Sequence, residues 1–180
     1  MKKILIPAFF VLIAAQLYVP ASMIFEREKV IERGEVFLFE TAPIDPRDPF
    51  RGQYIRLNFE EDSYVPADIS RFEYEQKVYV HLQKNNDNVA EVIGLSLNKP
   101  TNKNYLEVSI SNISNDRVYF EYPFDRFYME ETKAPKAENA LRQRTPGQRK
   151  KAYAKVHVWQ GNSVISDVLI EGKSIKAIVE

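Results

Sequence analysis

A charge-free apolar run at the amino terminus constrains this chain more than any other feature. Met1, Lys2 and Lys3 are followed by Ile4–Ile24, which contains no charged side chain. About twenty apolar residues in a helix match the roughly 30 Å hydrocarbon core of a bilayer. We therefore expect a cytoplasmic start at residues 1–3, a transmembrane anchor at residues 4–24 and a connector at residues 25–34.

The alternative for this run is a cleaved secretory signal, which has an apolar core of about 7–15 residues and a small-x-small cleavage site. Pro20 stands next to the small residues Ala21 and Ser22, so the cleavage site is poor and the length favours a retained anchor. Lys2 and Lys3 favour the cytoplasmic side. The expected location in a Gram-negative cell is the inner (cytoplasmic) membrane, with the carboxyl-terminal domain in the periplasm.

The rest of the chain, residues 35–180, has the length of one domain and the patterns of a β-rich fold. Ile55, Leu57 and Phe59 alternate with polar residues, as a half-buried strand requires. Similar patterns predict strands at 35–40, 53–59, 78–82, 92–97, 105–110, 118–122, 152–159, 164–170 and a last strand through Val179. Ala134–Arg144 favours a helix. The prediction is mainly β: a single β-sandwich or partly open barrel with one short helix, preceded by one transmembrane helix.

Composition excludes several kinds of chemistry. The chain has no cysteine, which excludes disulfides and thiolate sites. Lys plus Arg equals Asp plus Glu at 25 each, so no global charge favours nucleic acid as a partner. His81 and His157 are far apart in sequence and lack metal-ligand spacing. We expect no metal, no cofactor and no recognisable catalytic residue set.

One loop concentrates charge and proline. Pro43, Pro46 and Pro49 exclude a helix interior or a central strand there. The candidate binding residues of this loop are Asp45, Arg47, Asp48, Arg51, Gly52 and Tyr54. Two carboxylates and two guanidinium groups suit an acid/base pair or an anion clamp. The alternative is a rigid loop whose charges satisfy one another and cap backbone amides, and the proline spacing favours it.

Two further stretches have a functional and a structural interpretation. The aromatic residues of 119–128 predict core and sheet packing, with a ligand groove as the alternative. The basic run from Arg142 to Lys151 is typical of a solvated helix end and loop, with contact to anionic lipid headgroups as the alternative.

The segment from Gly52 to Phe59, preceded by the loop Asp45–Arg51, resembles the signature of the GDYXXLXY proteins. Gly52, Tyr54 and Leu57 match that signature, whereas Gln53 replaces its Asp and Phe59 its final Tyr. The resemblance extends over nearly the whole chain. It implies a membrane-anchored bacterial protein of unassigned biochemical role, with a multi-pass membrane protein as a possible companion. If the family acted through the signature Asp, this chain would lack that acid, because Gln53 stands in its place.

Three functions remain open from the sequence. The first is a non-catalytic, extracytoplasmic binding or scaffold module that is held at the membrane and associates with a membrane protein partner. The second is a membrane-bound peptidase of signal-peptidase type, with Ser22 as nucleophile and Lys155 as base, which must lie within hydrogen-bond reach. The third is a small-ligand or lipid-binding β domain.

Overall fold

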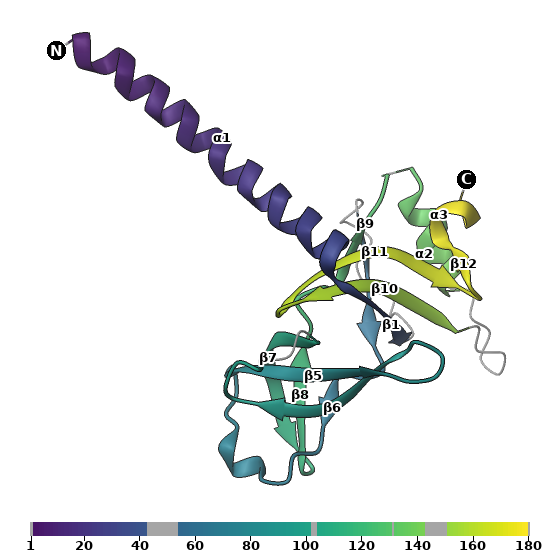
Figure 1. Ribbon diagram of the computed structural model, residues 1–180. Coiled ribbons are helices and arrows are strands. Elements are labelled where there is room, and N and C mark those ends of the chain that lie inside the picture. Colours follow the sequence, from purple (N-terminus) through teal and green to yellow (C-terminus); the bar gives the residue numbers. More distant parts are fainter. Residues whose placement is uncertain (1, 43–53, 102–103, 131, 143–150, 180) are drawn as a thin grey trace.

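A long helix leads directly into the β domain. The computed structural model describes residues 2–42, 54–101, 104–130, 132–142 and 151–179. Helix α1 (Lys2–Arg33) projects away from the strands, with its amino terminus far from them (Figure 1). The most apolar 18-residue window of its segment Phe9–Arg33 has a mean hydropathy of 1.7, and the helix is long and apolar enough to cross a membrane. Large apolar side chains on it, such as Phe10, Leu17 and Tyr18, are exposed.

The expected connector at residues 25–34 is helical as far as Arg33. Glu, Arg and Lys are good helix formers, and the segment from Glu26 to Arg33 contains neither Gly nor Pro. The first Gly or Pro after Glu26 is Gly34, and strand β1 (Glu35–Ala42) begins directly after it. The helix and the sheet are therefore joined by a single residue.

Within the residues that the structure describes, the strands form two five-stranded antiparallel sheets and one two-stranded ribbon. The first sheet has the order β12-β11-β10-β1-β3 and the second the order β4-β8-β7-β5-β6, while β2 pairs with β9. The strands are β1 (Glu35–Ala42), β2 (Tyr54–Arg56), β3 (Asn58–Phe59), β4 (Ser63–Tyr64), β5 (Lys77–Lys84), β6 (Ala90–Ser96), β7 (Tyr105–Ser114), β8 (Arg117–Glu121), β9 (Arg126–Tyr128), β10 (Ala152–Trp159), β11 (Asn162–Ile170) and β12 (Lys173–Ser174).

The two sheets close into a barrel-like arrangement around one core. The amide of Leu38 on β1 donates to the carbonyl of Asn88, at the turn between β5 and β6, at 3.1 Å. A second bridge joins Leu106 on β7 to Gly161. The alternation predicted for β10 is confirmed, because Ala152, Ala154, Val156 and Val158 are all buried. The predicted fold class is therefore confirmed: mainly β, with an apolar helix in front.

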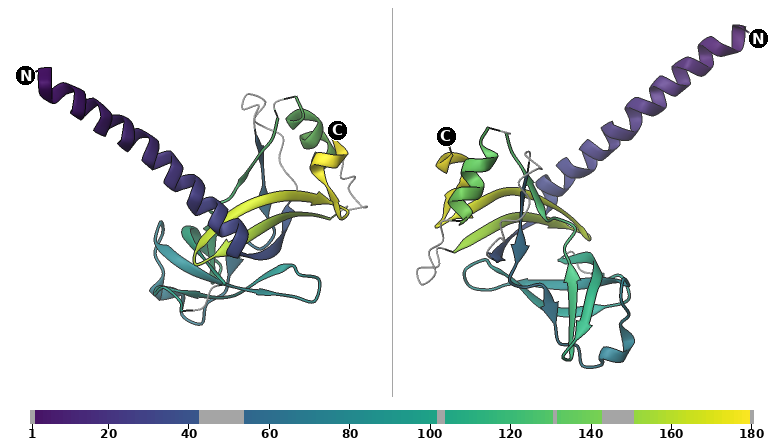
Figure 2. Two further views of the ribbon diagram at one scale, coloured as in Figure 1. Left: turned by 45° about the horizontal axis from the view of Figure 1, so that its top comes forward. Right: turned by 180° about the vertical axis from the view of Figure 1, so that it is seen from behind.

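Two short helices lie next to each other beside the first sheet (Figures 1 and 2). Helix α2 (Ala134–Arg142) confirms the predicted helix within the described residues, and it buries Ala137 and Leu141. The predicted last strand is wrong beyond β12, because helix α3 (Ile175–Ile178) follows it. The Ser174 hydroxyl accepts the amide of Lys176 at 3.3 Å and caps this turn, which turns Ile175 into the core.

A 3₁₀ turn that the sequence patterns did not indicate, η1 (Ile69–Arg71), lies between β4 and β5. The Asp68 side chain accepts the amide of Ser70 at 3.1 Å and caps it. In Figure 1 this turn lies at the end of the barrel away from α1.

Candidate functional site

Most of the candidate loop lies outside the described residues. Tyr54 is the only member of the set that the structure describes, while Asp45, Arg47, Asp48, Arg51 and Gly52 all fall within 43–53. Tyr54 is the first residue of β2, whose partner is β9. Whether the four charged side chains pair with one another or converge on a cleft stays a prediction.

Tyr54 belongs to an outward-facing group of aromatic and arginine side chains. Its ring lies 5.6 Å from the ring of Tyr128, directly across the β2–β9 pair. The guanidinium carbon of Arg126 stands 5.1 Å from the centre of the Tyr54 ring, within range of a cation–π interaction. Arg56 completes the outer face of the pair. We call Tyr54, Arg56, Arg126 and Tyr128 the β2–β9 face.

The apolar positions of the signature strand belong to the core. Ile55 and Leu57 are buried, and the amide of Leu57 donates to the carbonyl of Asp125 at 2.7 Å. Phe59 packs edge to face against Phe39, with 5.9 Å between their ring centres. At these positions the signature therefore builds the barrel, whereas Tyr54, at another described signature position, lies on the outer face of the β2–β9 pair.

The aromatic stretch confirms the packing interpretation over most of its length. Phe120, Tyr122 and Phe124 are buried in the core. The Tyr122 hydroxyl donates to the carbonyl of Glu61, and burial raises the pKa of this hydroxyl well above its usual range. Tyr128 is an exception, because 62% of its surface is exposed.

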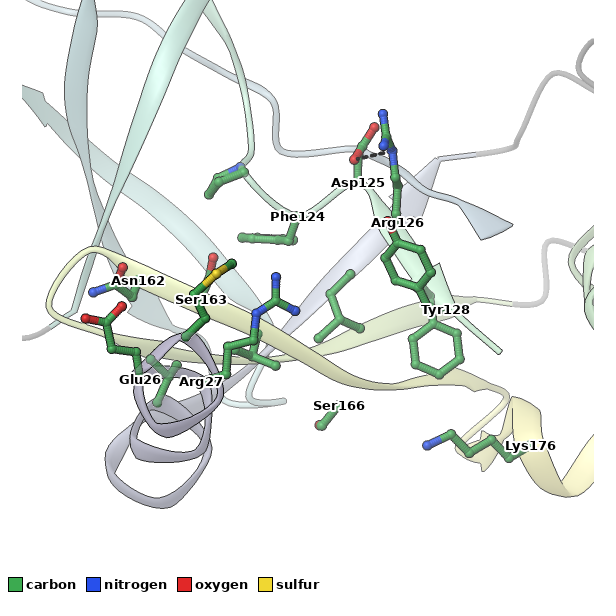
Figure 3. Close-up of a pocket in the computed structure, with 16 residues that line it drawn as sticks. Glu26, Arg27, Phe124, Asp125, Arg126, Tyr128, Asn162, Ser163, Ser166 and Lys176 are labelled. Carbon is green, nitrogen blue, oxygen red and sulfur yellow. Dashed lines mark ion pairs between the residues drawn. The ribbon is translucent and has the colours of Figure 1, made fainter. Parts of the chain in front are cut away.

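A pocket of about 660 Å³ opens between the end of α1, the β9 segment and β11. It is lined by Met23, Glu26, Arg27, Val30, Pro123, Phe124, Asp125, Arg126, Phe127, Tyr128, Asn162, Ser163, Val164, Ile165, Ser166 and Lys176. Figure 3 shows Arg27 reaching from α1 across β11, and Lys176 entering from the side of α3. We call this cavity the junction pocket, because helix and barrel build it together.

Helical spacing explains the α1 wall of the junction pocket. Met23, Glu26, Arg27 and Val30 stand at positions i, i+3, i+4 and i+7, which share one face of a helix. Val30 is buried against the barrel, whereas Glu26 and Arg27 flank the opening with opposite charges. In Figure 3 their charged ends diverge.

Some of the charged side chains that line the junction pocket form ion pairs, and others do not. Asp125 pairs with Arg126 and with Arg56, each at 3.5 Å. Hydrogen bonding to Tyr128 and the charge of Asp125 raise the pKa of Arg126, so its positive charge is secure. Lys176 lies 5.5 Å from the centre of the Phe127 ring. Arg27 and Lys176 form no ion pair with any residue that the structure describes.

The other candidate residues lie apart from one another. His81 on β5 is within 2.9 Å of the Ser96 hydroxyl, and His157 lies on β10 beside the end of α1. The described residues contain no group of three side chains suited to a metal.

The hydroxyl of Ser22 donates to the Val19 carbonyl of its own helix at 2.8 Å, and no hydrogen bond joins it to Lys155. The geometry required for the peptidase hypothesis is not present in these contacts. Of the basic run, Lys151 pairs with Glu40 at 3.4 Å, and 143–150 lie outside the described residues.

Sequence reasoning missed the junction pocket. Arg27 was placed in a connector and Lys176 in a strand, although both belong to helices. The spacing of Met23, Glu26, Arg27 and Val30 carried a signal, because it continues the helix past the apolar run. No local pattern connects this helix to β11 and α3.

No curated protein and no solved structure matches the chain. A family model described as GDYXXLXY protein matches residues 16–168, which include the α1 wall of the junction pocket, the signature strand and β9. The match covers well over half of the sequence, and the chain therefore belongs to the GDYXXLXY family.

Proposed function

We propose that this protein is a membrane-anchored, extracytoplasmic binding module that holds its β domain against the membrane and associates there with a membrane protein. In this proposal α1 spans the inner membrane with residues 1–3 in the cytoplasm. The exposed apolar surface of α1 supports this arrangement, because Phe9, Phe10 and Leu12 are each more than half exposed.

The observation that carries the proposal is the direct junction between α1 and the barrel. Gly34 alone separates α1 from β1, and Val30 is buried where the helix meets the barrel. A flexible tether would let the domain move far from the bilayer, whereas a direct helix–strand connection fixes its height and one of its faces relative to the membrane. A fixed orientation suits a domain whose partner is itself embedded in the membrane.

The β2–β9 face is the surface that we assign to the protein partner. It presents two tyrosines and two arginines, the residue types that are enriched in the energetically important parts of protein interfaces. Tyr128 is well exposed, and Arg126 holds Tyr54 in place through its guanidinium group. This face is continuous in sequence with the loop at 43–53, the candidate binding loop.

Site-specific photocrosslinking tests this proposal. A photoreactive phenylalanine analogue replaces Tyr128 in one variant of the full chain and Tyr74 in the other. Both tyrosines are exposed, at 62% and 67%, and Tyr74 follows η1 at the other end of the barrel. We expect Tyr128, and not Tyr74, to give one defined adduct with an integral membrane protein. Equal adducts from both positions, or none from Tyr128, would contradict the assignment.

A further inference from the structure

The junction pocket begins where the apolar part of α1 ends. Met23, at one end of its helical wall, lies within the charge-free run, and Val30, at the other end, lies six residues beyond the last residue of that run, Ile24. At 1.5 Å per residue, the wall from Met23 to Val30 is about 10 Å tall. The headgroup layer on each side of a bilayer is roughly 5–7 Å thick. If α1 spans the membrane as proposed, the pocket stands at the level of the lipid headgroups.

The chemistry of the pocket suits an anion with an apolar body. Arg27 and Lys176 approach it from opposite sides, as Figure 3 shows, and neither is neutralised by a described carboxylate. Two acids line the pocket: Asp125 already carries two arginine partners, and Glu26 forms no ion pair with Arg27, from which its carboxylate diverges in Figure 3. Met23, which is exposed, and the half-buried Val164 and Ile165 supply apolar surface beside these charges.

We propose that the junction pocket binds the phosphate-bearing headgroup of an anionic phospholipid from the leaflet in which α1 ends. The guanidinium group of Arg27 binds the phosphate, because a guanidinium paired with phosphate forms strong, charge-assisted hydrogen bonds. The ammonium group of Lys176, on the far side of the pocket, adds positive charge that favours an anionic headgroup. The apolar lining contacts the adjoining glycerol and upper acyl chain. This inference rests on the proposed membrane anchoring, and it adds a lipid ligand in a pocket that shares Arg126 and Tyr128 with the β2–β9 face.

Lipid retention in native mass spectrometry tests the proposal. The full chain is released from nanodiscs that contain equal amounts of phosphatidylglycerol and phosphatidylcholine. We expect the chain to retain one phosphatidylglycerol in clear preference to phosphatidylcholine. Arg27→Gln and Lys176→Gln should each lower the retained phosphatidylglycerol about fivefold, as expected for a basic residue near an anionic headgroup.

Two matched variants separate the pocket from general surface charge. Lys29→Gln removes a cation two residues from Arg27 but on the opposite side of α1. Lys173→Gln removes an exposed cation three residues from Lys176 that does not line the pocket. Both should retain phosphatidylglycerol at the wild-type level. Losses as large as those of Arg27→Gln and Lys176→Gln would overturn the proposal.

The same experiment distinguishes the possible failures. A chain that enters nanodiscs but retains both lipids equally would overturn the lipid site and leave the anchoring proposal standing. A chain that does not enter nanodiscs would contradict the anchoring itself. A separate sample in detergent receives inorganic phosphate alone. Retention of that phosphate with dependence on Arg27 and Lys176 would show a free-phosphate site and overturn the assignment to a lipid.

Discussion

Gly34 shows how closely single residues constrain the junction of helix and barrel. Its amide donates to the Val30 carbonyl at 2.8 Å, which closes the last turn of α1. A Cβ atom at this position would lie 2.3 Å from that carbonyl oxygen and 3.1 Å from the Cβ of His157. The oxygen belongs to the backbone, so the helix end itself would have to move to admit a methyl group.

Replacing Gly34 should therefore weaken the junction. We expect Gly34→Ala to lower the free energy of unfolding by about 1–3 kcal/mol, the usual cost of overpacking. The matched control is Gly94→Ala, because a Cβ at Gly94 would meet nothing closer than a His81 carbon at 3.8 Å. Chemical denaturation of both variants in detergent measures the difference. Equal stabilities would contradict the tight junction.

Leu57 is the signature residue with the clearest structural role, since only 1% of its surface is exposed. We expect Leu57→Ala to destabilise the barrel by about 2–5 kcal/mol through loss of apolar contacts and the cavity that remains. The exposed neighbour Asn58, replaced by Ala, should change stability by less than about 0.5 kcal/mol. A Leu57→Ala protein as stable as Asn58→Ala, in the same denaturation experiment, would show that Leu57 is not part of the core.

At the scale of elements, periodicity predicted the strands well and their interruptions poorly. A single strand was expected over 53–59, but β2 ends at Arg56 and β3 begins at Asn58. The cause is non-local: the Leu57 amide bonds to the Asp125 carbonyl, which lies in a distant part of the chain. The sequence of α3 was ambiguous for a similar reason, because its few apolar residues fit a strand or a helical turn, and the Ser174 cap decides between them.

The packing of α1 on β10 should make stability depend on pH through His157. Burial lowers the pKa of His157 below its usual 6.5, the nearby charge of Lys155 lowers it further, and a hydrogen bond with the Ile31 backbone opposes both. Its Nδ1 atom is buried without a hydrogen-bond partner among the described residues. The folded protein therefore binds fewer protons than the unfolded chain just below pH 6.5, so acidification destabilises it.

Thermal unfolding of the full chain from pH 7.5 to pH 5 measures this dependence. The melting temperature should fall as the pH falls below 6.5, and His157→Gln should reduce that fall. At pH 7.5 the histidine is neutral in both the folded and the unfolded wild-type protein. The difference in melting temperature between wild type and His157→Gln at this pH therefore gives the effect of the substitution alone. Parallel curves over the whole range would contradict the role of His157.

At the scale of the whole molecule, the apolar amino-terminal helix and the fold class could be predicted from sequence, and the candidate pocket could not. A charge-free run and alternating strands are local signals that need no knowledge of the fold. The junction pocket joins Arg27, Phe127 and Lys176 from three parts of the chain, and only the closed barrel brings these parts together. The loop at 43–53 was the better sequence candidate because its charges are adjacent in the chain.

The central claim is that α1 remains in the membrane and holds the β domain on the extracytoplasmic side. The chain has no cysteine, so Asn86→Cys introduces a single thiol at an exposed turn of the barrel. A membrane-impermeant maleimide is added to intact Gram-negative cells whose outer membrane admits it, and the membranes are then washed with alkaline carbonate. We predict that the full-length chain is labelled before lysis and stays in the washed membrane. Labelling only after lysis, or release of the labelled chain by carbonate, would contradict the claim.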